Sequence, residues 1–196
     1  MKLIISTTAP YSRKCRVLVQ EFGLEREVEE MESHPFEDDE ALLQANPLGR
    51  VPCLLLDDGQ ALTESGLIAD YLAEQAGNPW PRGWDDRRLE ALASGLLDLT
   101  VARRVEMVRD EHIRSDYWIG RRERGIIRAL DEVENLMGHV ENPLALGPLT
   151  MATAMSYLDF RYPESRWREG RPELQALVEA WEGRASFRST RPPSGS

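Results

Sequence analysis

The segment Ala9-Pro10-Tyr11-Ser12 contains the first residues whose types and spacing could support chemistry. It follows the apolar run Lys2-Leu3-Ile4-Ile5 and precedes a helical pattern. A thiol redox protein with this local plan would carry Cys-Pro-Tyr-Cys here. Alanine and serine therefore stand where two sulfur atoms would lie, and any thiol chemistry at this place needs another source of sulfur.

Two further segments could contact a ligand. In Val51-Pro52 the proline opens a strand, where it cannot donate to the ladder. A cis bond there would turn the N–H and C=O groups of Val51 outward, as a strand-like contact for a bound peptide. The alternative is an ordinary trans proline at a strand edge.

The segment Thr63-Glu64-Ser65-Gly66 opens a helix. The unpaired N–H groups of a helix start, with the hydroxyl of Ser65, could hold a carboxylate. Glu64 could hold an ammonium group alongside. A ligand with an α-amino acid head group fits both halves, whereas the alternative is a plain N-cap serine beside an acid.

Alternating strand and helix patterns position these segments. Strands are expected at residues 3–5, 26–31, 51–56 and 61–62, and helices at 12–22, at 38–45 and from Thr63-Glu64-Ser65-Gly66 onward. Gly23 is expected at the C-terminal end of the first helix, and residues 57–60 are expected to form a hairpin turn. The order β-α-β-α-β-β-α predicts a two-layer α/β domain over residues 1–77.

The second half is expected to be entirely helical. Residues 78–84 contain two prolines and indicate a linker, after which residues 85–196 form the second domain. Long helices are expected at 85–113, with Val105 on the apolar face, and at 115–140, with Ile127 on the apolar face. Shorter helices are expected at 150–162 and 173–184, followed by a tail from which Phe187 packs against the first domain. Thr150 is expected as an N-cap, with Thr153 in place of an acid three residues later, which weakens the cap by about 1 kcal/mol.

Composition narrows the function classes. The chain has 196 residues, is 41% hydrophobic and 30% charged, and carries a formal net charge of −10. This charge argues against non-specific binding to nucleic acid or to an anionic membrane. The basic run at 121–124 includes an acid and is typical of a solvated helix face. No apolar run approaches the roughly 20 residues of a transmembrane helix, and residues 1–5 do not resemble a signal peptide, so a cytoplasmic location is expected.

Cysteine usage agrees with that expectation. Cys15 and Cys53 are far apart, with no CxxC pair and no clustered histidines, so no metal site is expected. Both are expected as small buried apolar residues. Cys15 also lies about one turn into a predicted helix, where a thiolate would be stabilised.

Together, APYSRKCRV, NPLGRVPCLLLDDG and LTESGLIADYL resemble, in this order and spacing, the glutathione-binding domain of the cytosolic glutathione transferases. The run Gly147–Ala154 resembles the N-capping box of a buried helix in that family's helical domain. Residues 157–161, Trp167, Arg171-Pro172 and residues 186–193 resemble a bacterial subgroup. The resemblance covers nearly the whole chain and implies an α/β thioredoxin-like domain followed by an all-α helical bundle, in a two-fold homodimer.

The resemblance also implies roles for individual residues. Val51, before a cis Pro52, would pair with the cysteinyl part of glutathione, and Glu64 and Ser65 would hold the γ-glutamyl head. Arg50 and His34 lie where side chains often approach the glycyl carboxylate. A second, electrophilic substrate would lie against Tyr11, Met107 and Arg103 or Arg104; the alternative for Met107 is core packing.

The departure from the family is at Ala9. Serine-type branches place a hydroxyl immediately before the Pro-Tyr or Pro-Phe pair, and redox-type branches use a cysteine near there. One hydrogen bond to a charged group is worth about 1.5–3 kcal/mol, so its loss would raise the thiol pKa by roughly one to two units. Ser12 could replace the donor, Thr8 could do so, or only the helix N–H groups act. Ser12 could equally be a plain N-cap, and Arg13 and Lys14 would help if they face the cleft.

Three functions remain at this stage. The leading hypothesis is a glutathione transferase-like enzyme that directs the glutathione thiolate at an electrophile or peroxide. The alternative is a weakly active or non-catalytic binding or interaction protein on the same fold, which the missing donor favours. A thiol-disulfide oxidoreductase using Cys15 is disfavoured, because Cys15 has no resolving neighbour and should point into the core.

Overall fold

The computed structural model describes residues 1–34, 36–77, 83–138, 140 and 142–193. The chain divides into two compact units, one made of residues 1–81 with 182–196 and the other of residues 82–181. The first unit therefore includes C-terminal residues that the sequence pattern assigned to the helical part. No helix in the described ranges is both long and apolar enough to cross a membrane.

A mixed four-stranded sheet forms the centre of the first unit. Its strands are β1 (Lys2–Ile5), β2 (Glu29–Glu32), β3 (Cys53–Leu55) and β4 (Ala61–Thr63), in the spatial order β2-β1-β3-β4. β1 pairs with β2 in parallel and with β3 antiparallel, and β3 pairs antiparallel with β4. β3 is shorter than predicted, because Val51 and Pro52 lie before the ladder. The hairpin turn is confirmed, with the Leu56 N–H donating to the Gln60 C=O at 2.8 Å and Gly59 at φ +85°.

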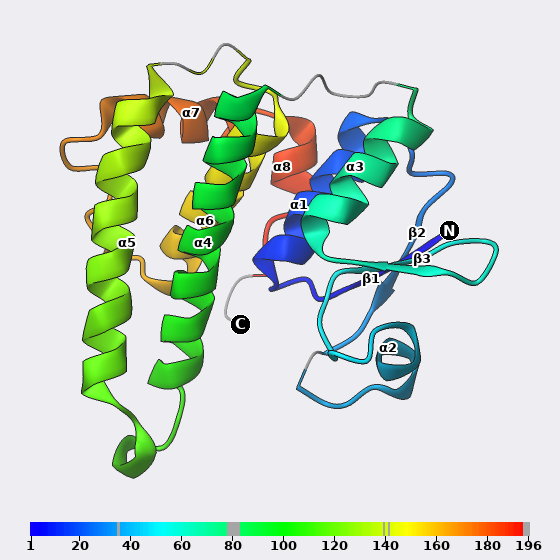
Figure 1. Cartoon of the computed structure of the whole chain (residues 1–196), viewed down its shortest axis with the longest axis horizontal. Helices are drawn as coiled ribbons and strands as arrows, with labels where there is room; N and C mark the ends of the chain where they lie inside the picture. The colour runs from blue at the N-terminus through cyan, green and yellow to red at the C-terminus, as the bar shows by residue number, and fades with distance from the viewer. Residues whose placement is uncertain (35, 78–82, 139, 141, 194–196) are drawn as a thin grey trace. The chain divides into compact units, whose positions relative to one another are not determined.

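Helices cover both faces of this sheet. They are α1 (Pro10–Glu21), α2 (Glu40–Ala45) and α3 (Ser65–Gln75). Figure 1 shows α1 and α3 together on one side of the sheet and α2 on the other. α1 begins two residues earlier than predicted, because Pro10 takes its first position, where a missing N–H costs nothing. Gly23 follows the helix at φ +69°, as expected for the residue after a C-cap.

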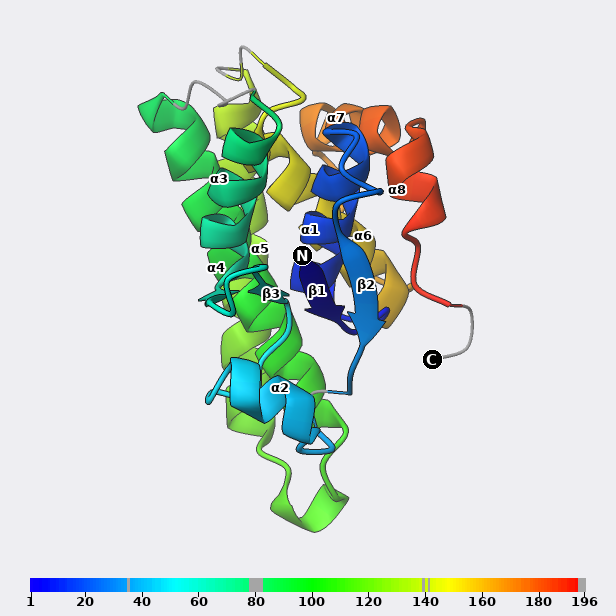
Figure 2. The ribbon, with the colours of Figure 1, turned by 90° about the vertical axis from the view of Figure 1, so that its right-hand side faces the viewer.

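The C-terminal segment returns to the first unit. α8 (Ala185–Ser189) packs beside α1, and Figure 2 shows the two helices next to each other. Phe187 is fully buried there, as the sequence predicted. At the C-terminal end of α1, the Glu21 carboxylate accepts hydrogen bonds from the Arg184 guanidinium and the Ser186 hydroxyl. Burial tends to raise the pKa of Glu21, but these hydrogen bonds outweigh burial and leave that pKa lowered.

The second unit is helical. It contains α4 (Trp84–Met107), the 3₁₀ turn η1 (Glu111–Ile113), α5 (Asp116–Met137), α6 (Leu146–Arg161) and most of α7 (Pro172–Glu182). The predicted linker lies mostly outside the described residues, but Trp84 already belongs to α4. The predicted helix over 85–113 is wrong in its last turn, since α4 ends at Met107.

Two details of the apolar pattern and of α6 also differ from expectation. Val105 and Ile127, predicted on apolar faces, are 42% and 48% exposed. The prediction that Thr150 caps a helix is wrong, because α6 begins at Leu146 and the Thr150 hydroxyl donates to the Leu146 C=O at 2.7 Å inside the helix. Thr153 is likewise inside α6, so it belongs to no capping box.

The starts of α5, α6 and α7 each contact a carboxylate from another helix, whereas α4 starts at Gly83 with no side-chain cap among the described residues. At the start of α6, the Gly147 N–H donates to the Asp86 carboxylate on α4 at 2.8 Å. A Cβ at Gly147 would lie 2.6 Å from the Asp86 C=O oxygen, so only glycine permits this approach. At the start of α7, the N–H groups of Glu173 and Leu174 donate to the Glu134 carboxylate on α5, at 3.0 and 2.9 Å.

The start of α5 is closed in the same way. The Glu106 carboxylate accepts from the N–H of the N-cap residue Ser115 at 2.8 Å, and the Ser115 hydroxyl accepts from the Trp118 N–H at 3.4 Å. This backbone hydrogen bond, with the charges of Arg109 and Arg122, holds the pKa of Glu106 below its usual value despite burial.

Candidate functional site

The connection between β1 and α1 contains the segment that first indicated chemistry. Ala9 is the N-cap of α1, and within the described residues no side chain caps this helix start and no acid lies in its first turn. Thr8, Ala9 and Tyr11 are half-buried. A neutral, uncapped helix start of this kind favours a bound anion.

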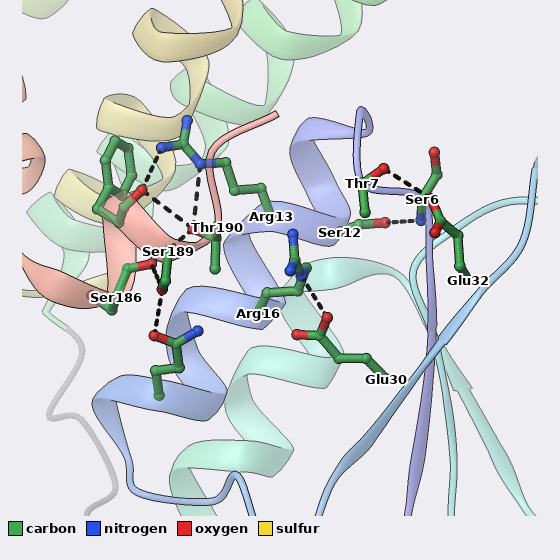
Figure 3. A network of polar contacts seen from close by, with 12 residues as sticks. Ser6, Thr7, Ser12, Arg13, Arg16, Glu30, Glu32, Ser186, Ser189 and Thr190 are labelled. Carbon is green, nitrogen blue, oxygen red and sulfur yellow. Dashed lines mark hydrogen bonds and ion pairs between the residues drawn. The ribbon is translucent and has the colours of Figure 1, made fainter. Parts of the chain in front are cut away.

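Hydroxyl groups surround this helix start. Ser12 is fully buried, and its Oγ accepts a hydrogen bond from the Ser6 N–H at 3.2 Å; Figure 3 shows the Ser12 side chain directed at Ser6. Ser12 is the third residue of α1, so its interpretation as an N-cap is wrong. Because its side chain has no exposed surface, its geometry weighs against direct contact with a thiol from solution.

Thr8 is placed differently. Its hydroxyl lies 3.4 Å from the Ser6 hydroxyl, which is long for an O–H···O bond. A half-buried hydroxyl held so loosely can turn toward a ligand. The neighbouring Thr7 is committed elsewhere, because its hydroxyl donates to Glu32 at 2.8 Å.

Arg13 and Lys14 are buried rather than exposed to a ligand. Arg13 is 3% exposed, donates to the Phe187 C=O at 2.8 Å, and stacks 3.9 Å from the centre of the Phe187 ring. Figure 3 shows its side chain directed at Thr190, whose hydroxyl accepts from the Arg13 Nε at 3.5 Å. Burial, followed by the charge of Arg191, lowers the pKa of Arg13 to about 10. Lys14 is fully buried. The contacts of Arg13 therefore orient it toward the C-terminal segment.

The Val51-Pro52 peptide bond is cis, as the resemblance implied. Val51 is half-buried and precedes β3, and no hydrogen bond to its backbone N–H or C=O occurs within the described part of the chain. Asn46 fixes the preceding turn by donating to the Arg50 C=O at 2.8 Å and accepting from the Leu48 N–H at 3.1 Å. Both polar groups of Val51 are thus available to an extended ligand.

The start of α3 combines an unusual backbone with an open helix end. Glu64 is the N-cap and is exposed, at φ 71° and ψ 125°. A non-glycine residue in that conformation costs of order 1–3 kcal/mol and is typical of functional sites. Ser65 is the first helical residue and is 5% exposed, so its interpretation as a plain N-cap is wrong. Among the described residues nothing accepts from its N–H, and its hydroxyl makes no hydrogen bond.

The two residues suggested for a glycyl carboxylate lie on the surface. Arg50 is exposed and forms no ion pair with any described residue. His34 is exposed, and its Nδ1 lies 3.4 Å from the Phe36 N–H and 3.9 Å from a Glu37 carboxylate oxygen. Their assignment to a ligand stays a prediction.

The residues suggested for a second substrate are divided between the units. Tyr11 is in α1 of the first unit, and Arg103 and Met107 are in α4 of the second. Met107 is half-buried at the end of α4, outside the fully buried core. Arg103 stacks on the Tyr162 ring at 4.3 Å.

Both cysteines are buried. The Cys15 thiol is fully buried, lies 3.9 Å from the Ser65 C=O, and has a pKa raised by burial to about 12. Burial also raises the pKa of the Cys53 thiol. A nucleophilic thiol needs a lowered pKa and access to solvent, so the structure argues against disulfide chemistry at Cys15.

Sequence reasoning missed two features of this site. Ser6, which links Ser12 and Thr8, follows β1 directly, and a hydroxyl at that place could have been a signal. The left-handed backbone of Glu64 had no such signal, because glycine rather than glutamate is the usual mark of that conformation.

Comparisons with known proteins found relatives in sequence and in structure. Residues 8–75 match the family model described as "Glutathione S-transferase, N-terminal domain". The chain is 34% identical to the uncharacterized GST-like protein YibF of Escherichia coli strain K12 over 202 aligned positions, covering 98% of this chain and 99% of the relative.

Solved structures extend the likeness over the whole chain. A glutathione transferase family member from Pseudomonas fluorescens Pf-5, crystallised with glutathione, is 36% identical with a TM-score of 0.92, covering 98% of both chains. A glutathione S-transferase from Methylobacterium radiotolerans JCM 2831, in complex with glutathione sulfonate, is 33% identical with a TM-score of 0.89, covering 100% of this chain and 96% of that one.

Proposed function

The chain belongs to the glutathione S-transferase family, and on that premise we propose that it binds glutathione and directs its thiolate at an electrophile or a peroxide. Relatives from Pseudomonas fluorescens and Methylobacillus flagellatus were crystallised with glutathione. The Pseudomonas protein was also crystallised with S-(propanoic acid)-glutathione, in which the sulfur carries a carbon substituent. These complexes support glutathione as a substrate and carbon–sulfur bond formation as its reaction.

The start of α3 is the observation that carries the proposal. The Ser65 N–H and hydroxyl have no acceptor or donor among the described residues, and the exposed Glu64 precedes them in a costly backbone conformation. The γ-glutamyl head of glutathione has a carboxylate that suits Ser65 and the helix start, and an ammonium group that suits Glu64.

The backbone of Val51 would hold the cysteinyl part. Its free N–H and C=O can exchange two hydrogen bonds with an extended peptide, as at a sheet edge. Arg50 and His34 would approach the glycyl carboxylate.

The reaction would use the start of α1. The glutathione thiol, with an ordinary pKa of about 8.5, loses its proton to solvent. The thiolate attacks the electrophilic carbon, so that a C–S bond forms while the leaving group departs with its electron pair. With a peroxide, two glutathione molecules give the disulfide, water and an alcohol. The helix N–H groups and the Thr8 hydroxyl would stabilise the thiolate.

A set of variants tests whether the Thr8 hydroxyl donates a hydrogen bond to the bound thiolate. Thr8→Val should raise the pKa of the bound thiol by roughly one unit, whereas Thr7→Val, which loses the hydroxyl bound to Glu32, should leave that pKa unchanged. Ala9→Ser should lower it, by restoring a hydroxyl before Pro10. The pKa is measured from the ultraviolet absorbance of the thiolate in the glutathione complex. An unchanged pKa in Thr8→Val would leave the helix N–H groups as the remaining donors.

The second candidate is a binding or interaction protein on the same fold. Ala9 favours it, because the usual hydroxyl or thiol is missing. Retention on immobilised glutathione, followed by a conjugation assay with 1-chloro-2,4-dinitrobenzene, separates the two. Retention with turnover supports the enzyme, retention without turnover supports the binding protein, and the absence of retention contradicts both. The homodimer and the cytoplasmic location stay predictions.

A further inference from the structure

The C-terminal segment, residues 184–190, contacts α1 near its end. The Glu21 carboxylate accepts from the Arg184 guanidinium and the Ser186 hydroxyl. Glu21 lies about 16 Å along the helix axis from Pro10, the first residue of α1, because an α-helix rises about 1.5 Å per residue. This contact is therefore remote from the helix start that is proposed to stabilise the thiolate.

The same segment contacts α1 one turn from its start, through Arg13. The Arg13 guanidinium donates to the Phe187 C=O at 2.8 Å, and its carbon lies 3.9 Å from the centre of the Phe187 ring. The Arg13 Nε lies 3.5 Å from the Thr190 hydroxyl, which itself donates to the Ser186 C=O at 2.8 Å. Phe187 and Thr190 are fully buried. The guanidinium is thus held both on its face and on its edge.

Packing of the segment does not by itself call for an arginine. Burying a cation costs free energy, and the lowered pKa of Arg13 reflects that cost. An apolar side chain would pack against Phe187 without it. Arginine adds direction, because its planar group stacks with one face and donates within its plane, whereas lysine is a point charge on a flexible stem. Arg13 is therefore suited to fixing a position.

The backbone of Arg13 connects this contact to the helix start. Its N–H donates to the Ala9 C=O at 3.0 Å, and the Ala9 N–H donates to the Ser6 C=O at 3.0 Å. The Ser6 N–H donates to the Ser12 hydroxyl oxygen at 3.2 Å, and the Ser6 hydroxyl lies 3.4 Å from that of Thr8. Hydrogen bonds therefore join Arg13 to the residues that are proposed to stabilise the thiolate.

Side chains of β2 hold the same region less firmly. Arg16 pairs with Glu30 at 2.9 Å, and the Thr7 hydroxyl donates to Glu32 at 2.8 Å; Figure 3 shows both contacts together with that of Arg13. Both are exposed, and exposed ion pairs contribute little to stability. The buried contact of Arg13 is therefore the firmer constraint.

We propose that Arg13 is a positioning residue: held by Phe187 and Thr190, it fixes the first turn of α1 in the place from which that turn stabilises the glutathione thiolate. The inference rests on the proposed function and adds the C-terminal segment to its machinery. All of these residues belong to the first unit. Arg13 touches no reacting atom in this role and acts through the backbone that it anchors.

A matched pair of substitutions tests the proposal. Arg13→Lys keeps the positive charge near the start of α1 but loses the planar group, and Arg184→Lys makes the same change at the contact near its end. Arg13→Lys should raise the pKa of the bound glutathione thiol by about half a unit to one unit, and Arg184→Lys should leave it unchanged. The ultraviolet absorbance of the thiolate in the glutathione complex measures this pKa. An unchanged pKa in Arg13→Lys, or an equal rise in Arg184→Lys, would overturn the proposal.

A neutral change on the other side of the contact separates position from charge. Phe187→Leu removes the ring on which Arg13 stacks and leaves the guanidinium charge in place. It should raise the thiol pKa, as Arg13→Lys does. Because this pKa is measured on the folded complex, a general loss of stability does not move it. If Phe187→Leu left the thiol pKa unchanged, the C-terminal segment would have no part in stabilising the thiolate, and the proposal would be wrong.

Hydrogen exchange in the free protein keeps this inference independent of the proposed function. The Ser6 and Ala9 N–H groups are both hydrogen-bonded, so their exchange, followed by NMR, reports on the start of α1. It should be roughly fivefold faster or more in Arg13→Lys and Phe187→Leu than in the wild type, and unchanged in Arg184→Lys. If glutathione is not bound, the proposed function fails, and these rates still decide whether Arg13 holds the helix start. Unchanged exchange in either Arg13→Lys or Phe187→Leu would overturn the inference.

Discussion

The starts of α5, α6 and α7 in the second unit differ from the starts of α1 and α3 in the first. In the second unit, α5, α6 and α7 each begin against a carboxylate from another helix, which accepts from backbone N–H groups. In the first unit, α1 and α3 begin with no side-chain cap among the described residues and with no acid in the first turn. The two helices proposed to face glutathione are therefore among the described helices that start with no side-chain cap, as α4 and α8 also do.

We interpret this difference as one between helix ends that stabilise the fold and helix ends that are proposed to bind glutathione. A cap contributes about 0.5–2 kcal/mol to stability, and α1 and α3 do without it. Their partial positive charges remain for an incoming carboxylate or thiolate, each worth about 0.3–1 kcal/mol and up to about 2 in partly buried sites. Four predictions test this interpretation.

The largest effect is expected at Gly147. In Gly147→Ala the new Cβ would lie 2.6 Å from the Asp86 C=O oxygen and 2.9 Å from the capping carboxylate. We expect a loss of about 3 kcal/mol, because backbone cannot move aside as a side chain can. The melting temperature should fall by about 6–12 °C. Gly95→Ala, also in a helix but with open space, should stabilise by up to about 1 kcal/mol. Equal melting temperatures for the two variants would contradict the cap at α6.

The next effect is expected at Ser65. Ser65→Ala should weaken glutathione binding by roughly tenfold or more, because a hydrogen bond to a charged group is lost, and Ser65→Thr should restore part of it. Ser115→Ala is the matched change at a capped helix start, and should cost about 1 kcal/mol of stability without affecting glutathione affinity. Titration calorimetry measures the glutathione affinity of each variant, and thermal melting measures its stability. A loss of glutathione affinity in Ser115→Ala would remove the distinction between the starts of α3 and α5.

A smaller effect is expected from the backbone of Glu64. Glu64→Gly should stabilise the free protein by about 1 kcal/mol, since glycine adopts positive φ without strain, and should weaken glutathione binding. Asp38→Gly changes the other described non-glycine residue with positive φ, at 49°, and should leave affinity unchanged. Glutathione affinity retained in Glu64→Gly would show that the strained residue has no part in binding.

The smallest effect is a change in acid sensitivity. The lowered pKa of Glu106 means that its cap stabilises the fold above the ordinary glutamate pKa of about 4.3 and is lost as pH falls through the lowered value. Glu106→Gln keeps an oxygen acceptor for the Ser115 N–H but cannot titrate. The urea midpoint of the variant should therefore fall less steeply below pH 4.3 than that of the wild type. If the urea midpoints of the variant and the wild type changed in parallel with pH, the titration of Glu106 would have no part in acid sensitivity.

The sheet and most helices were predictable from the sequence, because short apolar runs mark β1 and β3 and the helical spacing of apolar residues marks α1 and α3. The predicted helix boundaries were wrong where residues far along the chain determine them. The sequence pattern could not show that Asp86 reaches Gly147, so α6 was expected to start at Thr150. Val105 and Ile127 fit a helical repeat, yet they are exposed, since periodicity does not indicate how far a neighbouring helix extends.

The site was predictable where a motif fixes the backbone. Glu64 and Ser65 were found together at a helix start, and the cis bond before Pro52 was confirmed. Ser12 shows the limit of local reasoning, because its hydroxyl accepts from the Ser6 N–H, which no spacing rule connects to it. Arg13 is similar: its partners Phe187 and Thr190 lie far along the chain.

The return of α8 to α1 has a consequence for synthesis of the protein. When the ribosome has released the four strands and α1 to α3, the residues that cover Arg13 and Glu21 have not yet been made. Domains generally fold as units, N-terminal first, during translation, but here the first unit also contains residues from Glu182 onward, which are made after the whole of α4 to α6. A nascent chain stalled before Ala185 would contain the sheet and α1 without α8.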